Sequence, residues 1–281
     1  MKTKDGIRYE ERVFSESRQV IVDVLDIAKS KHTVWGLFEC DVTDARQLIA
    51  EYKERTGKRF SFTGWIVACI AKALDENKRM QAYRKGKDKL IIFDDVDVTL
   101  MVERQIKGRP VPTTYLIRAA NKKSVLEIHQ EIKEAQRVKD ESVSTETEKS
   151  KSGASKLLKL PGFLRRFVFN RVIRDPFKKK KYYGTIGVTS VGMFGQGTQG
   201  GWAIPITPHC MSFALGALGK KPGVVDGEIK IREYLCITVA VDHDLVDGGP
   251  GTRFLKKFHT LVESSYGLHE LLDEGGDLDD G

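Results

Sequence analysis

Cysteine is scarce in this chain of 281 residues, and its four cysteines lie far apart, each inside or beside an apolar run. No two of them form a Cys-x-x-Cys pair. This spacing argues against a zinc site and against a disulfide framework, and it fits a reducing compartment. We therefore expect no bound metal and a cytoplasmic location.

Long apolar runs are missing as well. The first residues, MKTKDGIRYEERVF, contain no apolar stretch of the kind found in a secretory signal. The most apolar helical stretch, residues 62–74, is too short to span a bilayer and predicts a buried helix. With 40% hydrophobic and 31% charged residues, the composition is that of an ordinary globular protein, long enough for one large domain.

The net charge of +8 comes largely from one segment, residues 149–181, whereas the C-terminal end is acidic. The basic segment carries no zinc-finger, RRM or KH pattern, so we do not expect a nucleic-acid partner. Phosphate-bearing ligands, a membrane surface or an acidic partner would each account for it, as would a simple solvated helix face. Contact with a membrane surface is the alternative we favour least.

Hydrophobic periodicity predicts helices that alternate with strands. Ser15 or Ser17 is placed to cap the first helix, Ser61 or Thr63 to cap the third, and the Asp226-Gly227 pair favours a tight hairpin turn. Expected helices cover residues 15–30, 44–53, 62–74, 122–138 and 252–263. Expected strands cover residues 32–43, 89–93, 96–103, 111–117, 183–190, 202–206, 212–218 and 228–241. This order predicts an α/β (α+β layered) domain in which a mixed sheet is flanked by helices.

The chain reads as one domain, residues 1–281, with three unusual stretches. Residues 139–156 have almost no large apolar side chain and predict a flexible loop. Residues 157–181 predict a basic helical insertion interrupted at Pro161 and Gly162, and residues 273–281 predict a mobile acidic tail. The insertion could be a lid that grips a polyphosphate or a membrane, but we favour a cover packed on the core by Leu164, Phe167, Val168 and Val172.

The stretch VAVDHDLVDGG, residues 239–249, begins as a strand and breaks into an acidic run around one histidine. His243 and Asp247 therefore lie where a rigid strand turns into a loop, which is a common place for reactive side chains. An imidazole there can take a proton from a thiol or hydroxyl near neutral pH. By itself the spacing His-x-x-x-Asp-Gly also fits a structural histidine beside a strand.

Four segments in the same order resemble the dihydrolipoamide acyltransferases, the transacylase component of 2-oxo acid dehydrogenase complexes. They are SFTGWIVACIAKALDENKRMQAY, VPTTYLIRAANKKSVLEIHQEI, GTIGVTSVGMFG and VAVDHDLVDGGPGTRFL. The likeness runs from about residue 32 to residue 255. It implies a chloramphenicol acetyltransferase-like fold, a homotrimer, and an active site at the interface between neighbouring subunits.

The resemblance also implies the chemistry. The catalytic histidine falls on His243, the loop aspartate on Asp247, and the hydroxyl that hydrogen-bonds the oxyanion on Thr189, with Ser190 as the alternative. Coenzyme A or acyl-CoA would be a substrate. No lipoyl domain is recognisable here, so the lipoyl group that accepts the acyl group would belong to a separate protein. We expect Trp35, Trp65 and Trp202 to be core residues rather than platforms for a ligand. We expect His32 to be structural, and Asp242 to cap the loop or face solvent.

One departure stands beside the expected catalytic histidine. The family has an arginine after the histidine where this chain has Asp244, a charge reversal that would favour the protonated imidazole unless a nearby cation compensates. Three functions therefore stay open. The first is acyl transfer between CoA and a thiol, the second is acyl transfer to a small hydroxyl or amine compound, and the third is an impaired scaffold of the same fold.

Overall fold

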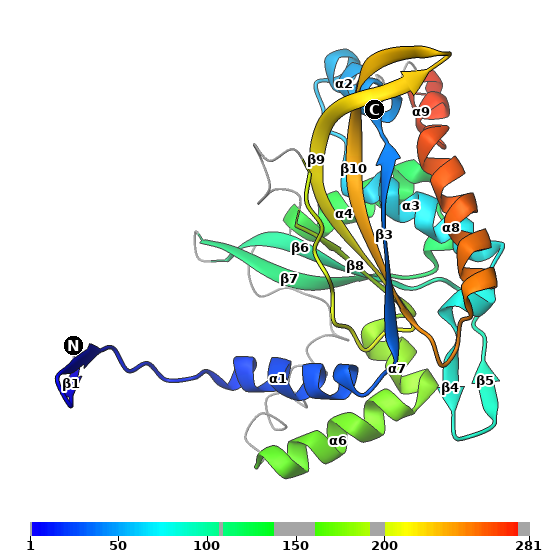
Figure 1. Cartoon of the computed structure of the whole chain (residues 1–281). Coiled ribbons are helices and arrows are strands. Elements are labelled where there is room, and N and C mark those ends of the chain that lie inside the picture. The colour runs from blue at the N-terminus through cyan, green and yellow to red at the C-terminus, as the bar shows by residue number, and fades with distance from the viewer. Residues whose placement is uncertain (1, 107–108, 138–160, 192–199, 275–281) are drawn as a thin grey trace.

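The computed structural model describes residues 2–106, 109–137, 161–191 and 200–274. A mixed sheet of six strands forms its centre, in the order β3-β10-β9-β8-β6-β7 (Figure 1). Strand β8 runs parallel to both of its neighbours, and the other neighbouring pairs are antiparallel. The predicted mixed sheet is therefore confirmed. The six strands are β3 (Thr33–Asp41), β6 (Val98–Ile106), β7 (Arg109–Ile117), β8 (Ile186–Ser190), β9 (Met211–Val225) and β10 (Glu228–Asp242).

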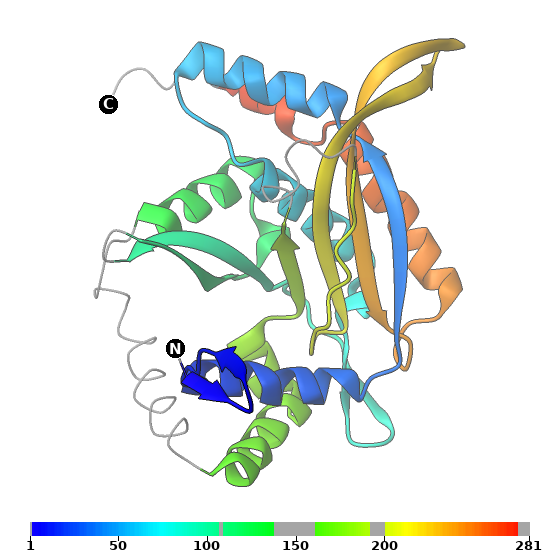
Figure 2. The same ribbon diagram turned by 60° about the vertical axis from the view of Figure 1, so that its left-hand side comes forward.

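Helices cover one face of this sheet and enclose the core (Figures 1 and 2). The apolar helix α3 lies between α4 and α8, and α4 and α8 contact the sheet. Burial of Trp65, Phe213, Phe254 and Phe258 at this interface removes large aromatic surfaces from water. The helices are α1 (Glu16–Lys29), α2 (Thr43–Thr56), α3 (Phe62–Asp75), α4 (Val125–Arg137), α6 (Gly162–Arg174), α7 (Pro176–Tyr183), α8 (Gly248–Glu263) and α9 (Leu268–Glu274).

The expected caps and turns are present. Ser15 accepts a hydrogen bond from the Arg18 N–H at the start of α1, and Ser61 accepts one from the Gly64 N–H at the start of α3. Gly57 ends α2 at a φ of 67°, in the left-handed region that glycine adopts without strain. The β9–β10 turn has positive φ at both Asp226 and Gly227, as a type I′ hairpin requires.

Several elements differ from the sequence prediction. Strand β9 continues to Val225, seven residues past its predicted end, and helix α9 was not predicted. Residues 202–206 form no strand. Two indole N–H groups hold this segment beside β3. Trp202 donates to the Phe38 carbonyl, and Trp35 donates to the Pro205 carbonyl. Pro205 itself has no N–H to donate to a neighbouring strand. Helix α8 begins at Gly248, four residues before the predicted start, so both glycines after Asp247 are helical.

Short elements outside the main sheet were not predicted in full. The N-terminal strands β1 (Lys2–Lys4) and β2 (Ile7–Tyr9) pair and project away from the body, joined to it by α1 (Figure 1). Strands β4 (Tyr83–Lys85) and β5 (Lys89–Ile91) make a second small hairpin. Two 3₁₀ turns complete the described elements, η1 (Lys78–Gln81) and η2 (Ala120–Lys122).

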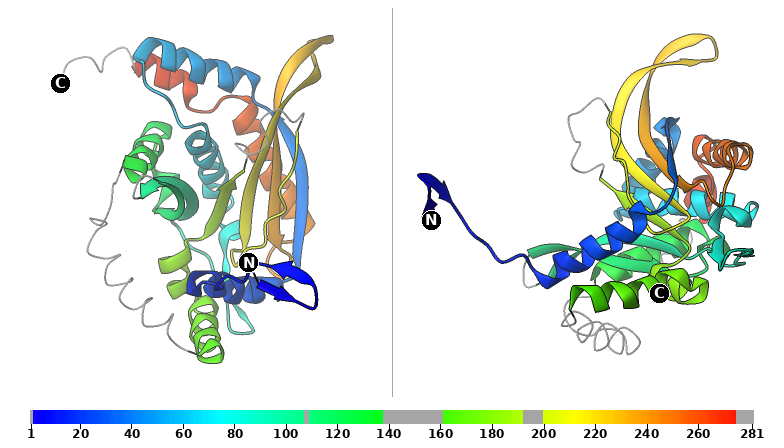
Figure 3. Two further views of the ribbon diagram at one scale, coloured as in Figure 1. Left: turned by 90° about the vertical axis from the view of Figure 1, so that its left-hand side faces the viewer. Right: turned by 60° about the horizontal axis from the view of Figure 1, so that its bottom comes forward.

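Helix α6 of the basic insertion lies below α1 and packs against it, and α7 leads from α6 back toward β8 (Figures 2 and 3). Its anchor differs from the expected one, because Leu164 and Phe167 are exposed. Arg165 and Ile173 are buried instead, and the Arg165 guanidinium donates to the Asp23 carboxylate of α1 at 2.5 Å. A buried ion pair thus holds α6 to α1. The predicted loop 139–156 and residues 275–281 of the predicted tail lie outside the described residues, whereas residues 273 and 274 of that tail are the last two residues of helix α9.

No helix in the described ranges is both long enough and apolar enough to cross a membrane. The four cysteines are buried and unpaired with one another.

Candidate functional site

Strand β10 ends at Asp242, and His243 is the next residue. The His243 N–H donates to the His32 carbonyl at 2.9 Å, which fixes the backbone at the point where the chain leaves the sheet. The turn closes when the N–H groups of Leu245 and Val246 donate to the Asp242 carbonyl. The His243 side chain is exposed, and its imidazole has no hydrogen bond to any described residue. The backbone is therefore fixed, while the imidazole is exposed to solvent and has no hydrogen-bond partner among the described residues.

One of the two sequence expectations for Asp242, that it faces solvent, is wrong. Its side chain is only 7% exposed and forms an ion pair with Lys31 at 2.9 Å. The Lys31 ammonium also donates to the His209 carbonyl at 2.7 Å. Charge pairing beneath the turn therefore holds the β10 end against the residues that precede β3.

Asp244 contacts His32 and not the imidazole it follows. Its carboxylate lies 2.8 Å from Nδ1 of His32. The hydrogen bond from Asp244, reinforced by its charge, raises the pKa of His32 above the ordinary 6.5. The carboxylate noted in the sequence is therefore paired with His32, a partner that the sequence could not identify.

This pairing predicts a measurable titration. We expect the His32 resonances in a proton NMR titration to report a pKa above 6.5, and Asp244→Asn to lower it because the charged partner is lost. A raised folded-state pKa means that the pair favours folding below pH 6.5 and that this contribution disappears as the pH rises through the raised value. An unchanged His32 titration in Asp244→Asn would contradict the assignment.

Asp247 lies at the N-cap position of α8, and its carbonyl accepts the Gly251 N–H at 3.1 Å. Its carboxylate neither caps the helix nor pairs with a cation among the described residues. Asp247 therefore stands exposed four residues after His243, free to contact a ligand or a neighbouring subunit. No three His, Cys, Asp or Glu residues in the described part of the chain are grouped so as to hold a metal ion.

Thr189 lies near the end of β8, half-buried, and its hydroxyl makes no hydrogen bond within the described residues. Side chains alternate along a strand, so Thr189 lies on the face opposite to buried Val188, away from the helical layer. Ser190 lies on the same face as Val188. The alternation separates the two candidate hydroxyls and leaves Thr189 on the face that the helices do not cover. The neighbouring residues 192–199 lie outside the described ranges.

The sheet places Thr189 far from His243 within one chain. Thr189 lies opposite Ala214, and Ala214 lies opposite Thr238. His243 follows Thr238 by five residues, about 16 Å of extended strand, and two strand spacings add about 10 Å across the sheet. Base and oxyanion donor must both lie within about 3 Å of the reacting group. One chain therefore cannot bring these two side chains to the same substrate.

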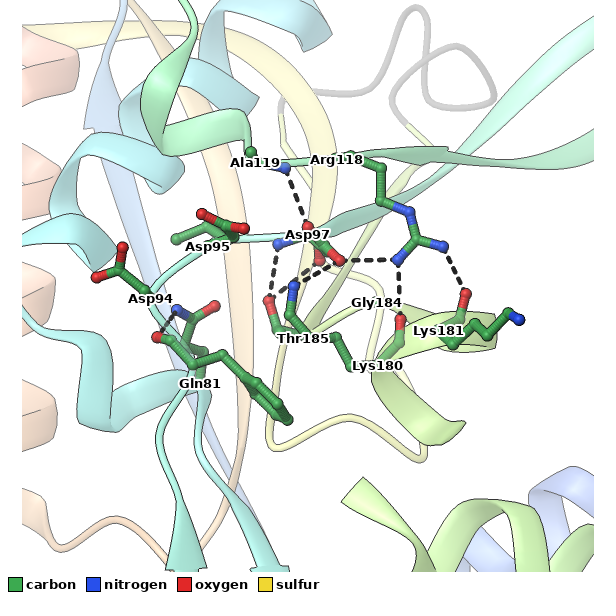
Figure 4. Close-up of polar contacts among 12 residues, drawn as sticks. Gln81, Asp94, Asp95, Asp97, Arg118, Ala119, Lys180, Lys181, Gly184 and Thr185 are labelled. Atoms are coloured by element: carbon green, nitrogen blue, oxygen red, sulfur yellow. Dashed lines mark hydrogen bonds and ion pairs between the residues drawn. The ribbon is translucent and has the colours of Figure 1, made fainter. Parts of the chain in front are cut away.

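A buried carboxylate fixes the start of β8 (Figure 4). Asp97, with a side chain only 3% exposed, accepts hydrogen bonds from Arg118 and Lys180, both at 2.8 Å, and from the Ala119 N–H at 3.0 Å. Its own carbonyl accepts the Thr185 N–H. Burial would raise the pKa of Asp97, but the hydrogen bonds from Lys180, Ala119 and Arg118 outweigh it and lower the pKa. The network joins β6, β7, α7 and β8 at one corner.

Asp97→Asn should lower the free energy of unfolding by about 3 kcal/mol, because it leaves two cations beside a neutral amide. We expect a loss of stability at the lower end of what breaking a buried ion pair costs, because the Arg118 side chain is half-exposed. Since the folded-state pKa of Asp97 is lowered, its contribution should be present above pH 3.8 and should disappear as the pH falls through the lower folded value. Urea unfolding of both proteins between pH 3 and pH 7 measures this. Equal stability at pH 7 would contradict it.

The sequence interpretation missed several residues that position the site. Lys31 and Asp97 carried no motif signal, and their partners lie far away in the sequence. Trp65 is buried as expected, but Trp35 and Trp202 are each 43% exposed, so the prediction that they are core residues was wrong. Trp35 on edge strand β3 gives the same local pattern as a tryptophan in a central strand, and only the sheet order places it at the edge. Trp202 lies on no strand.

Comparison with known proteins agrees with the motifs. Residues 8–152 and 180–269 match the family model of the 2-oxoacid dehydrogenases acyltransferase catalytic domain. The acetyltransferase component (dihydrolipoyllysine-residue) of the pyruvate dehydrogenase complex of Rickettsia conorii is 25% identical over 245 residues, covering 85% of this chain and 50% of that protein. The succinyltransferase component of the 2-oxoglutarate dehydrogenase complex of Rickettsia felis is 24% identical, and the match covers 91% of this chain and 56% of that protein. The chain spans about half the length of these relatives.

Solved structures share the fold. A probable dihydrolipoamide acetyltransferase from Listeria monocytogenes superposes with a TM-score of 0.66 at 21% identity, covering 92% of this chain and 95% of that one. The dihydrolipoamide acetyltransferase of Azotobacter vinelandii also superposes with a TM-score of 0.66. Its identity is 18%, and the match covers 96% of this chain and 98% of that one. These matches confirm the predicted layered fold.

Proposed function

The chain belongs to the family of 2-oxoacid dehydrogenase acyltransferase catalytic domains, and from this premise we propose that it transfers an acyl group between coenzyme A and a thiol, the dihydrolipoyl group of a separate protein. The observation that carries the proposal is the exposed imidazole of His243, held by its backbone at the rigid end of β10 and free of any hydrogen bond to the described residues. Asp244, the best argument for an impaired scaffold, is paired with His32 instead.

The reaction needs one base and one oxyanion donor. His243 removes the proton from the attacking thiol, and the thiolate adds to the thioester carbonyl. The Thr189 hydroxyl donates a hydrogen bond to the oxygen that becomes negative. Collapse of the tetrahedral intermediate expels the second thiolate, which recovers the proton from His243. Asp247, exposed beside the histidine, contributes to the loop on which the substrates meet.

We propose that the site is completed between subunits of a homotrimer, because His243 and Thr189 lie too far apart within one chain. An exposed apolar patch supports contact with a second copy. The patch consists of exposed side chains on one face of edge strand β3 and on residues 202–206, which run beside this strand, namely Trp35, Leu37, Trp202, Ile204 and Ile206. Exposed apolar surface of this kind, on an open sheet edge, marks an association site. One hydrophobic core includes buried residues from Cys40 to Leu272, which supports the proposal that the chain is one catalytic domain.

Leu37→Asp should dissociate the trimer, because it places a carboxylate in the middle of the apolar patch, where association would bury it. Sedimentation velocity on wild type and variant measures the change. A wild type that sediments as a monomer at working concentration would contradict the trimer, and a variant that remains trimeric would move the interface away from β3.

Thiol release tests the function itself. Acetyl-CoA and a panel of longer and acidic acyl-CoAs are mixed with dihydrolipoamide, and free CoA is followed over time. We expect CoA release that requires dihydrolipoamide, with one acyl group preferred. Release only with a small hydroxyl or amine acceptor would favour the second candidate function. Absence of transfer to any of these acceptors would contradict acyl transfer.

A further inference from the structure

The basic insertion supplies one side of a pocket, and the family match does not include this insertion. The family model skips residues 153–179, and these residues supply α6 and the first half of α7. The inserted helices lie beside α1, with which α6 packs, and beside β4, with which α7 packs (Figure 3). Between them is a pocket of about 600 Å³. Asn170, Arg174 and Lys179 of the insertion line one side, and Lys31, Arg84 and Asp242 line the other.

Positive charge exceeds negative charge in this pocket. Lys31 is already paired with Asp242. Arg84 donates only to the Gly86 and Lys87 carbonyls, and neither it nor Arg174 or Lys179 has a carboxylate partner among the described residues. The lining therefore holds four basic side chains, Lys31, Arg84, Arg174 and Lys179, against one carboxylate, Asp242. A second hollow of about 520 Å³ shares Asn170 and Arg174 with the first, so the positive lining continues along α6.

Lys179 is the most constrained of these basic side chains. Its side chain lines the pocket although the residue is only 5% exposed, and its Nζ atom lies 3.8 Å from the centre of the Tyr83 ring. Burial lowers its pKa well below the ordinary 10.5, and the neighbouring Lys31 lowers it further, although the Asp242 carboxylate opposes this in part. A buried ammonium whose charge is only partly balanced is costly. A negative group in the pocket would remove this cost.

We propose that this pocket binds a small molecule through its phosphate groups. The Arg84 and Arg174 guanidiniums would hold phosphate oxygens through paired N–H donors, Lys179 would supply a buried charge, and Asn170 an amide donor without a partner among the described residues. The volume suits a group the size of a nucleotide. Carboxylates are a poorer match, because the basic side chains of the lining provide more charge than one carboxylate neutralises.

The pocket adjoins the proposed active site. Lys31, Asp242 and Leu245 line it, and the first two of these also fix the turn that carries His243. The phosphates could therefore belong to the CoA substrate itself or to a separate anionic metabolite that binds behind the turn. Both sources share the same recognition chemistry, and neither requires that acyl transfer occur.

Calorimetric titration with inorganic pyrophosphate and with adenosine 3′,5′-bisphosphate tests the site. We expect both probes to bind, and Arg84→Gln and Arg174→Gln each to weaken binding about tenfold or more through loss of charge-assisted hydrogen bonds. Both arginines are exposed, so these variants should fold. Arg137→Gln is the matched control, because Arg137 is an exposed arginine of α4 that lines neither hollow.

Equal affinity in wild type, both pocket variants and the control would overturn the proposal, as would the absence of binding at millimolar probe. Competition between pyrophosphate and CoA would identify CoA as the source of the phosphates. Simultaneous binding of both would identify a separate anion. Because these titrations measure binding without turnover, loss of the proposed acyl transfer would leave their result unaffected.

Discussion

His243→Ala should lower the rate of acyl transfer by about 10³, because general-base catalysis by a positioned side chain contributes on this scale. The imidazole is exposed and contacts no described side chain through a hydrogen bond, so its removal should leave the fold and the oligomer intact. The measurement is CoA release from acetyl-CoA with dihydrolipoamide, followed at saturating substrate. Sedimentation velocity and circular dichroism of the variant verify that only the chemistry has changed.

The pH dependence of this deficit separates a base from a binding residue. The thiolate is the nucleophilic form of a thiol, so a preformed thiolate replaces the base once the pH approaches the pKa of the thiol. The gap between His243→Ala and wild type should therefore narrow as the pH rises toward the pKa of the acceptor thiol. His269→Ala is the matched control, since His269 is exposed on α9 and lies outside the site. A His243→Ala variant with wild-type rates would remove His243 from the mechanism.

Thr189→Ala should lower the rate by about 10² to 10³, the usual cost of removing one oxyanion donor. Thr189→Ser keeps the hydroxyl and should retain most of the activity. Ser190→Ala tests the neighbouring hydroxyl, which lies on the opposite face of β8 and should be dispensable. If Ser190→Ala lost the activity and Thr189→Ala kept it, the assignment of the oxyanion donor would be reversed.

Subunit mixing tests where the two residues meet. Trimers assembled from equal amounts of the His243→Ala and Thr189→Ala chains contain interfaces at which an intact His243 faces an intact Thr189. In a cyclic trimer with random assembly, half of the chains carry each residue, so roughly one quarter of the sites should recover. Two residues acting within one chain would give no recovery. The separation of about 16 Å along the sheet favours recovery.

Asp244 shows what the sequence alone left open at the site. In the sequence it follows the expected catalytic histidine, and the reversed charge suggested an imidazole held in its protonated form. Its partner, His32, is 212 residues away and reaches it only because β3 pairs with β10. The same strand pairing brings the His32 carbonyl to the His243 N–H. A contact of this kind depends on sheet order, which residue spacing does not encode.

The sequence by itself determined the features that depend on near neighbours. Capping by Ser15 and Ser61 and the turn at Asp226-Gly227 need only residues within a few positions, and the apolar run of α3 follows from its own composition. Four motifs in order were enough to identify the family and to select His243 and Thr189 as candidates.

Only the tertiary structure decided the features that join distant segments. The Lys31–Asp242 pair, the Asp97 network, the exposure of Trp35 and the pocket lined by Lys179 each depend on which strands and helices pack together. Their energies come from burial and from charges brought within a few ångströms, and both are properties of packed elements. Local periodicity predicts that an element forms, but the packing of the whole chain sets which side chains meet.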